Sequence, residues 1–319
     1  MSSLPEQFAD RHADILAHSR GLERDAAVHI VNLSGQVAAI LAGTNLARLS
    51  RRQTDSLIAK VVAAIESKYG VIAGATNSAV VAMMAATFPN LARQIGSRKR
   101  TPPAIDAVLV LGQTVQEAWK TAASSTAKAV VRELRMSIAA ERAVADGLFA
   151  KKGVFEKSAK NARLVTQAEV LAAETAVKKA AATETSLISG FRWSSMFDSK
   201  TCLVCAAMDG ELFDLNMVAK NPDVRAVGAS PAHGHCRCNM IPELAEDGPA
   251  SAIPGPDGKV SRGMDFEEWI GKKSKRYQEA YFGPGRYALW KRGDITLNDL
   301  MNGQGRIITL AELRAKYGE

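Results

Sequence analysis

The stretch CLVCAAMDGELFDLNMVAKNPDVRAVGASPAHGHCRC, residues 202–238, contains every cysteine of this 319-residue chain. It opens with a C-x-x-C pair, Cys202 and Cys205, and closes with two histidines and a C-x-C between His233 and Cys238. Two such turns can hold one metal ion in a tetrahedron of thiolate and imidazole ligands, with Zn–S bonds of about 2.3 Å. The spacing therefore predicts a structural zinc site that staples two turns distant in the sequence.

The stretch offers more ligands than a tetrahedral ion needs. The candidate metal ligands are Cys202, Cys205, His233, Cys236 and Cys238. The preferred set takes the first three and one of the last two, because H-x-x-C folds into a turn that can present both groups to one ion. An all-cysteine site is the near alternative. Within the stretch, Asp209-Gly210 is interpreted as a turn between short strands.

Other uses of the cysteines are weighed against structural zinc. Two disulfides would need an oxidising compartment, and residues 1–30 lack the apolar segment of a signal peptide. A redox pair would need a strand-to-helix context and leaves the C-x-C unexplained. Catalytic zinc would need a general base, and the sequence contains neither H-E-x-x-H nor the zinc-deaminase pattern. We therefore expect a structural protein and no enzyme.

The chain before the cysteines has a helical composition. No proline stands between Pro103 and Pro222, and the segment is rich in Ala, Glu, Lys and Leu. Leu111, Val115 and Trp119 lie four residues apart and predict one apolar helix face. The same reasoning predicts helices over 5–46, 51–69, 76–98, 104–148 and 160–188. Because alanine buries little area, we expect this part to be stabilised by neighbouring subunits.

Two segments of the helical part stand out by charge. Tyr69–Ala92 has no charged residue, which predicts a buried or assembly-facing helix, with a membrane span as the weaker alternative. Arg98, Lys99 and Arg100 form a basic loop that is either a phosphate contact or, as we favour, a solvated helix end. The net charge of +8 favours polyanionic partners without identifying one.

The chain after the cysteines changes character. Residues 243–264, rich in Gly, Pro, Ala and Asp, are interpreted as a linker without periodic structure. We expect a short helix to open at Phe266 and a last helix to be capped by Thr309 and Glu312 after a short strand. The aromatic side chains between them favour a small core or a docking face, and they are Trp269, Tyr277, Tyr281, Phe282, Tyr287 and Trp290.

An ordered set of residues within 160–242 forms a recognisable pattern, and its members are Trp193, Asp198, Thr201-Cys202, Cys205, Asp209-Gly210, Pro231, His233, Cys236-Arg237-Cys238 and Pro242. With this pattern the segment resembles the phage Mu protein F-like minor head (head morphogenesis) family. The resemblance implies a virion protein of a tailed phage or prophage, associated with the portal and present in few copies. It also implies that Asp198 and Arg237 are structural partners near the metal site. Gly234-His235 departs from the family's frequent Pro-Asn, so His235 could compete with His233 as a ligand.

These observations predict a mainly α protein in which long Ala-rich helices precede a small zinc-stapled α+β module and a short C-terminal docking segment. The predicted parts are a helical assembly region at 1–150, a minor-head-like domain at 151–242, a linker at 243–264 and a docking module at 265–319. The expected partners are the portal protein, the major capsid protein and possible packaged DNA, with no membrane. The expected location is the capsid, and the host cytoplasm during assembly. The alternative function is a zinc-containing nucleic-acid-binding protein.

Overall fold

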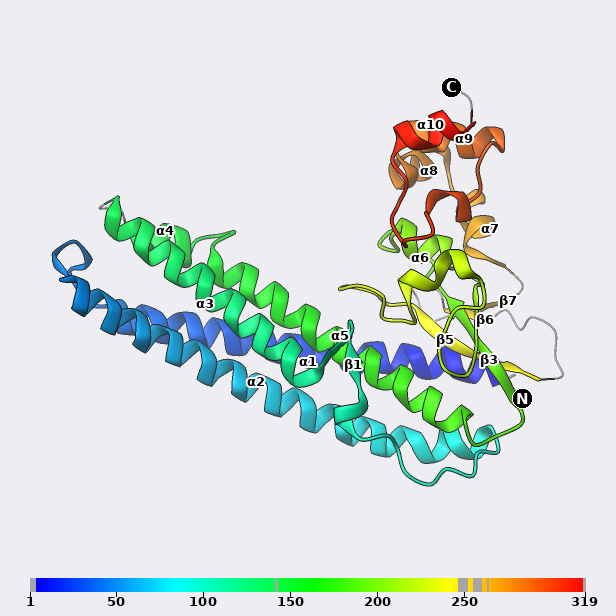
Figure 1. Cartoon of the computed structure of the whole chain (residues 1–319), viewed down its shortest axis with the longest axis horizontal. Helices are drawn as coiled ribbons and strands as arrows, with labels where there is room; N and C mark the ends of the chain where they lie inside the picture. The colour runs from blue at the N-terminus through cyan, green and yellow to red at the C-terminus, as the bar shows by residue number, and fades with distance from the viewer. Residues whose placement is uncertain (1–3, 141–142, 246–251, 255–259, 263, 318–319) are drawn as a thin grey trace. The chain divides into compact units, whose positions relative to one another are not determined.

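A computed structural model describes residues 4–140, 143–245, 252–254, 260–262 and 264–317 (Figure 1). The chain is 65% helical with small sheets, which confirms the prediction of a mainly α protein. The helices are α1 Leu4–Leu41, α2 Arg51–Gln94, α3 Val115–Ala139, α4 Val144–Leu148, α5 Val154–Ala182, α6 Leu203–Ala207, α7 Phe266–Gly271, α8 Lys275–Phe282, α9 Pro284–Arg292 and α10 Leu310–Tyr317. Short 3₁₀ turns are η1 Leu46–Arg48, η2 Ile105–Ala107, η3 Pro222–Val227 and η4 Asn298–Leu300. The strands are β1 Leu109–Val110, β2 Gln113–Thr114, β3 Ile188–Ser194, β4 Leu212–Phe213, β5 Asn239–Leu244, β6 Ala252–Pro254 and β7 Val260–Arg262.

The contacts group the chain into two compact units. The first contains residues 1–16, 84–103 and 174–319, and the second contains 17–83 and 104–173. Helices α1, α2 and α5 therefore each contribute one part to each unit. The predicted four-part division along the sequence stays a prediction.

Helix α2 corrects the prediction of two helices over 51–69 and 76–98. It runs unbroken from Arg51 to Gln94, with Pro89 inside it. Its buried side chains recur every three or four residues through the expected gap, and they are Val61, Ile65, Tyr69, Ile72, Thr76 and Val80. A side-chain carbon placed at Gly70 or Gly74 would meet no atom within 4 Å, and each glycine costs only about 1 kcal/mol relative to alanine. Packing along one continuous stripe therefore keeps the helix intact.

The apolar stretch of α2 is only partly covered by the chain itself. Its length and composition would suffice to cross a membrane, and its most apolar 18-residue window has a mean hydropathy of 1.6. Only 28% of that window is buried. The interpretation as a helix buried within this chain is therefore wrong for most of the window, and the assembly-facing interpretation stays a prediction.

The predicted helix over 104–148 is interrupted by a β-hairpin. Strands β1 and β2 pair around Leu111 and Gly112, whose φ angles are 51° and 81°. Two successive left-handed residues form a hairpin turn and cannot continue an α-helix. Helix α3 begins only after Thr114, which forms a capping box with Glu117. Leu111 is therefore exposed and does not share the buried face of α3 with Trp119.

Polar side chains tie the helices of the second unit together. The Tyr69 hydroxyl on α2 and Thr126 Oγ1 on α3 are 2.7 Å apart, and Thr126 donates to Ser158 Oγ on α5 at 3.0 Å. Trp119 Nε1 donates to Glu169 Oε2 at 2.7 Å. Burial raises the pKa of Glu169 to about 7 although the Trp119 hydrogen bond acts in the opposite direction. This carboxyl group therefore takes up a proton near neutral pH.

A three-stranded antiparallel sheet in the order β4-β3-β5 forms the framework of the first unit. A side chain at Gly190 in the central strand would lie 2.3 Å from the Phe213 carbonyl oxygen, so only glycine permits this approach of β3 to β4. Asp209 and Gly210 form a turn between α6 and β4, which corrects the expectation of a turn between two strands.

The predicted linker over 243–264 contains regular structure. Glu243 belongs to β5, where its carboxylate accepts a hydrogen bond from Arg192 Nε on β3. Strands β6 and β7 pair antiparallel between Ala252 and Arg262. Backbone pairing therefore overrides the turn-rich composition here, and the rest of the segment, 246–251, 255–259 and 263, lies outside the described residues.

The C-terminal segment folds around its aromatic side chains. Phe266 and Trp269 lie with ring centroids 5.6 Å from that of Phe197, so the segment extends a core that begins before the cysteines. The core interpretation of the aromatic residues is confirmed, and a docking role stays a prediction. The expected helix at Phe266 and the capping box of Thr309 and Glu312 are both present. The expected strand before Thr309 is a single bridge between Ile307 and Met301.

Replacing Glu169 with Gln should stabilise the protein above neutral pH. A carboxyl with a folded pKa of about 7 against an ordinary 4.5 binds its proton more tightly when folded. The stability that the protonated Glu169 carboxyl group contributes is therefore fully present below pH 4.5 and is lost as the pH rises through about 7. We expect E169Q to raise the melting temperature at pH 8 by about 10 °C, or about 3 kcal/mol, and to match the wild type near pH 4.5.

The control is Glu156→Gln on the same helix, where the carboxylate is exposed and pairs with Lys160 at 2.6 Å. This variant should give no gain at pH 8. Melting curves of E169Q that follow the wild-type pH dependence in parallel would contradict the assignment.

Candidate metal centre

The first two cysteines lie at the start of helix α6. Cys202 is the N-cap residue, and its Sγ accepts a hydrogen bond from the Cys205 backbone N–H at 3.4 Å. The C-x-x-C pair therefore spans the first turn of the helix, with both sulfurs on its N-terminal side. Cys205 is buried, whereas Cys202 is partly exposed.

The second pair lies in the loop that leads into β5. The Cys236 backbone N–H donates to the His233 carbonyl oxygen at 3.2 Å, which closes the H-x-x-C turn that the sequence predicts. Ser230 Oγ donates to the Cys238 carbonyl oxygen at 2.6 Å and lies 3.7 Å from Cys236 Sγ. Asn239, the next residue, begins β5, so the sheet fixes the position of the loop.

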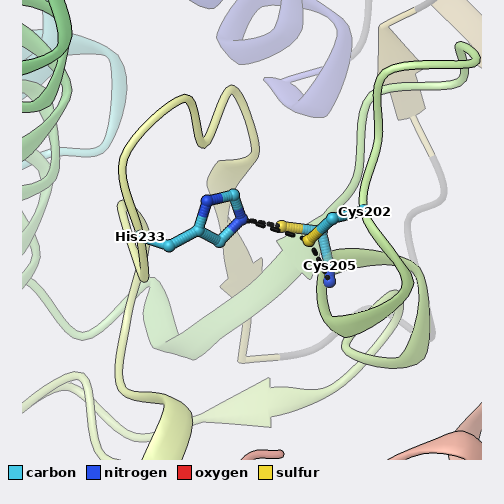
Figure 2. A group of neighbouring side chains, drawn as sticks. All are labelled: Cys202, Cys205 and His233. Carbon is cyan, nitrogen blue, oxygen red and sulfur yellow. Dashed lines mark hydrogen bonds between the residues drawn. The ribbon is translucent and has the colours of Figure 1, made fainter. Parts of the chain in front are cut away.

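The two segments bring their ligand atoms together. His233 Nε2 lies 3.2 Å from Cys202 Sγ and 3.0 Å from Cys205 Sγ, and its ring points at both sulfurs (Figure 2). Cys205 Sγ is 3.9 Å from Cys236 Sγ. In two groups, all ligand atoms lie within 4.8 Å of one another, and these groups are Cys202, Cys205 and His233, and Cys205, Cys236 and Cys238. Cys205 is common to both.

The donor set fits a tetrahedral thiophilic ion. Bonds of about 2.3 Å to two sulfurs at a tetrahedral angle place those sulfurs about 3.8 Å apart, close to the observed Cys205–Cys236 separation. The structure places the five predicted ligands in two groups of three that share Cys205, and each group could hold a metal ion. His235 belongs to neither group and is exposed, so the structure does not place it as a competitor of His233.

The tautomer of His233 suits a ligand at Nε2. Its Nδ1 lies 2.5 Å from the Gly234 carbonyl oxygen, which can only accept, so Nδ1 carries a proton. Without a metal, the hydrogen bond with Cys202 raises the pKa of His233 to about 9. Hydrogen bonds from Cys205 and His233 lower the pKa of Cys202 to about 4, although burial opposes this. A thiolate and an imidazolium therefore face each other where a cation would replace the Nε2 proton.

The groups around the four thiols also affect how the site could bind a metal ion. Hydrogen bonding with Cys202, Cys236 and Cys238 raises the pKa of Cys205, so the Cys205 thiol keeps its proton when no metal ion is bound. The buried Tyr281 hydroxyl finds no hydrogen-bond partner among the described residues, and burial followed by the charge of the thiols raises its pKa. The cysteines are not joined as disulfides, since the 3.9 Å between the Cys205 and Cys236 sulfurs exceeds a bond of about 2.05 Å.

A bidentate ion pair between Arg237 and Asp198 fixes the loop that carries the second cysteine pair. Arg237 Nη1 and Nη2 donate to the two carboxylate oxygens of Asp198 at 2.5 and 2.7 Å. Burial alone would raise the pKa of Asp198, but Arg237 and the backbone N–H groups of Lys200 and Thr201 lower it. The family resemblance implied that Asp198 and Arg237 are partners, and the structure confirms it.

A buried network of polar and charged side chains also contacts this loop. His12 Nδ1 lies 2.7 Å from Glu174 Oε2, and its Nε2 lies 2.9 Å from the Arg237 carbonyl oxygen. Both partners offer acceptor oxygens, so the ring links helix α5 to the loop that carries the second cysteine pair. Lys178 Nζ donates to Glu174 and to Asn239 Oδ1. Burial would raise the pKa of Glu174, but His12 and Lys178 lower it to about 2.

The sequence analysis missed several of these supporting residues. Glu174 and Lys178 lie four residues apart in an alanine-rich helix, and opposite charges at this spacing could have predicted their ion pair. Nothing in the sequence connects His12 with Glu174, which follows 162 positions later. Asp209, interpreted only as a turn residue, accepts hydrogen bonds from the backbone N–H groups of Ser195 and Phe266 at 2.7 and 2.9 Å.

Comparison with known proteins agrees with this picture over the region that contains the centre. Residues 111–241 match the family model described as Phage Mu protein F like protein. No curated protein and no solved structure matches the chain. The matched segment includes helices α3 to α6, the strands β3 and β4, and all five predicted ligands.

Removal of metal should destabilise the protein if the centre holds one. The two ligand-bearing segments bury few apolar side chains of their own, so binding free energy becomes folding free energy. We expect a strong chelator to lower the melting temperature by roughly 10 °C, and equimolar Zn²⁺ to restore it. A protein whose metal content falls to zero while its melting curve stays unchanged would contradict a structural metal.

Single substitutions should separate ligands from neighbours. Because Cys205 belongs to both groups, Cys205→Ser should abolish the thiolate-to-metal absorption of the Co²⁺-loaded protein. His233→Ala and Cys238→Ser distinguish the two predicted ligand sets. The all-cysteine site predicts that His233→Ala leaves the spectrum unchanged, whereas a site of Cys202, Cys205, His233 and Cys236 predicts this for Cys238→Ser. His235→Ala is the matched control and should keep both the spectrum and a stoichiometry of one Co²⁺. Retention of the full spectrum by C205S would contradict the site.

Proposed function

We propose that this chain, whose residues 111–241 are phage Mu protein F-like, is a structural minor head protein of a tailed phage or prophage. The family match carries the proposal, because it covers most of the sheet, helices α3 to α6 and the whole Cys/His cluster. In this role the protein joins the portal protein and the major capsid protein during head assembly. Its location is then the virion, and the host cytoplasm while heads assemble.

In this proposal the Cys/His cluster binds one structural Zn²⁺. Thiolate and imidazole donors are the usual ligands of such sites, and His233 presents Nε2 toward two sulfurs. The metal ion would supply a cross-link between α6 and the loop before β5. Cys202 and Cys205 would hold it from the helix, while His233 with Cys236 or Cys238 would hold it from the loop.

A structural rather than catalytic role follows from the number of donors. The five candidate ligands form two groups of three that share Cys205, so in this proposal one thiolate of the second group completes the tetrahedron of the first and leaves no position for water. Asp198, a carboxylate close to the loop, is engaged in both oxygens by Arg237 and is unsuited to act as a general base. We therefore propose that the chain is not an enzyme.

The proposal predicts incorporation into heads. When the chain is co-expressed with the portal and major capsid proteins of the same phage, we expect it to sediment with assembled heads in few copies. Deleting it should reduce the yield of heads that contain DNA. A chain that stays at the top of the gradient while heads form normally would contradict the proposal.

The same preparation tests the nucleic-acid alternative. The basic loop leaves Arg98 and Arg100 exposed, which is the feature in its favour. If phosphate contacts carried the function, the free chain would bind duplex DNA with an affinity that falls steeply between about 50 and 200 mM salt, by roughly 10²-fold or more. Binding of that kind without head association would favour the alternative.

A further inference from the structure

A long groove lies between α2 and α3 in the second unit. Its volume is about 1080 Å³, and it extends from Val62 to Asn77 along α2 and from Gln116 to Met136 along α3. At 1.5 Å per residue these spans are roughly 23 and 30 Å long. The groove therefore has the length of a helix of about 15 to 20 residues.

Small and aromatic side chains form one part of the groove lining. Gly70, Ala73 and Ala127 provide little bulk, so another backbone can approach closely. Tyr69 and Trp119 provide apolar walls, and their own polar atoms already bond to Thr126 and Glu169 inside the unit. A ligand in this groove would therefore gain mainly from apolar contact with the lining.

The charges of the groove are strongly one-sided. Its cations all belong to α3 and are exposed or partly exposed, and they are Lys120, Lys128, Arg132 and Arg135. Among the described lining residues, Glu66 on α2 is the only acidic one. Within the described part of the chain, Lys128, Arg132 and Arg135 form no ion pair. One edge of the groove thus carries positive charge that nothing described in this chain neutralises.

We propose that this groove binds an amphipathic helix of a partner protein, with large apolar side chains along one stripe and carboxylates on the flank that faces α3. The apolar stripe would fill the space above Gly70 and Ala127, and the carboxylates would pair with Lys128, Arg132 and Arg135. Such helix-in-groove recognition combines apolar anchors with complementary charge that sets the orientation.

The lining argues against two other occupants. A nucleic-acid backbone would find cations on one edge but mainly apolar side chains on the floor, which cannot contact phosphate. A second copy of α2 would present its uncharged stretch, Tyr69–Ala92, and leave the cations of α3 unpaired. The one-sided charge therefore selects an acidic helix.

Two synthetic helical peptides test the proposal with the full-length protein. Both are about 18 residues long and share one Leu and Ala stripe, but one carries Glu and the other Lys on the flank. Fluorescence anisotropy should show that the Glu peptide binds at least about tenfold more tightly than the Lys peptide, with a preference that shrinks as salt rises. The triple variant K128E/R132E/R135E should reverse this preference.

Two further variants keep the outcome interpretable. Gly70→Trp should block both peptides, because a Cβ at this position meets no atom within 4 Å and the indole ring would extend into the groove. An unchanged melting temperature of this variant would show that the fold is kept. Arg51→Glu, Arg52→Glu and Lys60→Glu together make the same charge change on exposed positions of α2 outside the lining and should leave binding unchanged.

Several results would overturn the proposal. Equal binding of the two peptides, or binding of neither, would exclude recognition of an acidic helix by this groove. Duplex DNA whose binding is lost in the triple variant would assign the cations to nucleic acid. A dimer in sedimentation that Gly70→Trp dissociates would assign the groove to a second copy of the chain. None of these results depends on the role proposed for the protein in heads.

Discussion

The first unit depends on a buried charge network that none of its members could form alone. Glu174 and Lys178 are almost completely buried, and an isolated charge at either position would cost several kcal/mol. Each is stabilised by the other, and His12 Nδ1 lies 2.7 Å from a carboxylate oxygen of Glu174. Because His12 also donates to the Arg237 carbonyl oxygen, the network fixes α1 and α5 relative to the loop that carries the second cysteine pair.

Further interactions extend this constraint from the network to the metal centre and the C-terminal segment. The Asp198 carboxylate holds the Arg237 side chain, while the two neighbours of Arg237 in sequence are candidate ligands. Asp209 accepts hydrogen bonds from Ser195, just after β3, and from the first turn of α7, so the C-terminal core begins at a fixed place. Five ligand groups can therefore meet although they lie on two segments with a 27-residue gap between Cys205 and His233.

The two units offer different kinds of function. The first contains a cluster whose donors face inward and whose proposed role is to cross-link the fold. The second contains an open groove with positive charge along one edge, which is a surface for recognition. The role proposed for the chain in head assembly would use both, because a stable module preserves the geometry while an exposed surface selects the partner. The hairpin at Leu111 and Gly112, which interrupts the helical pattern, sets where α3 and hence the groove begin.

Residue patterns were enough to predict the helical character of the chain, the H-x-x-C turn, the last capping box and the five candidate ligands. These are local properties, because periodicity, caps and short spacings act within a few residues. The folded chain was needed to show that α2 continues through Gly70, that Leu111 leaves the helix and that His12 meets Glu174. The first and the last depend on burial against segments far away in the sequence, because burial changes the energy of a glycine or a charge more than local preference does. Leu111 instead leaves the helix because it is an exposed turn residue between β1 and β2, where its positive φ cannot continue an α-helix.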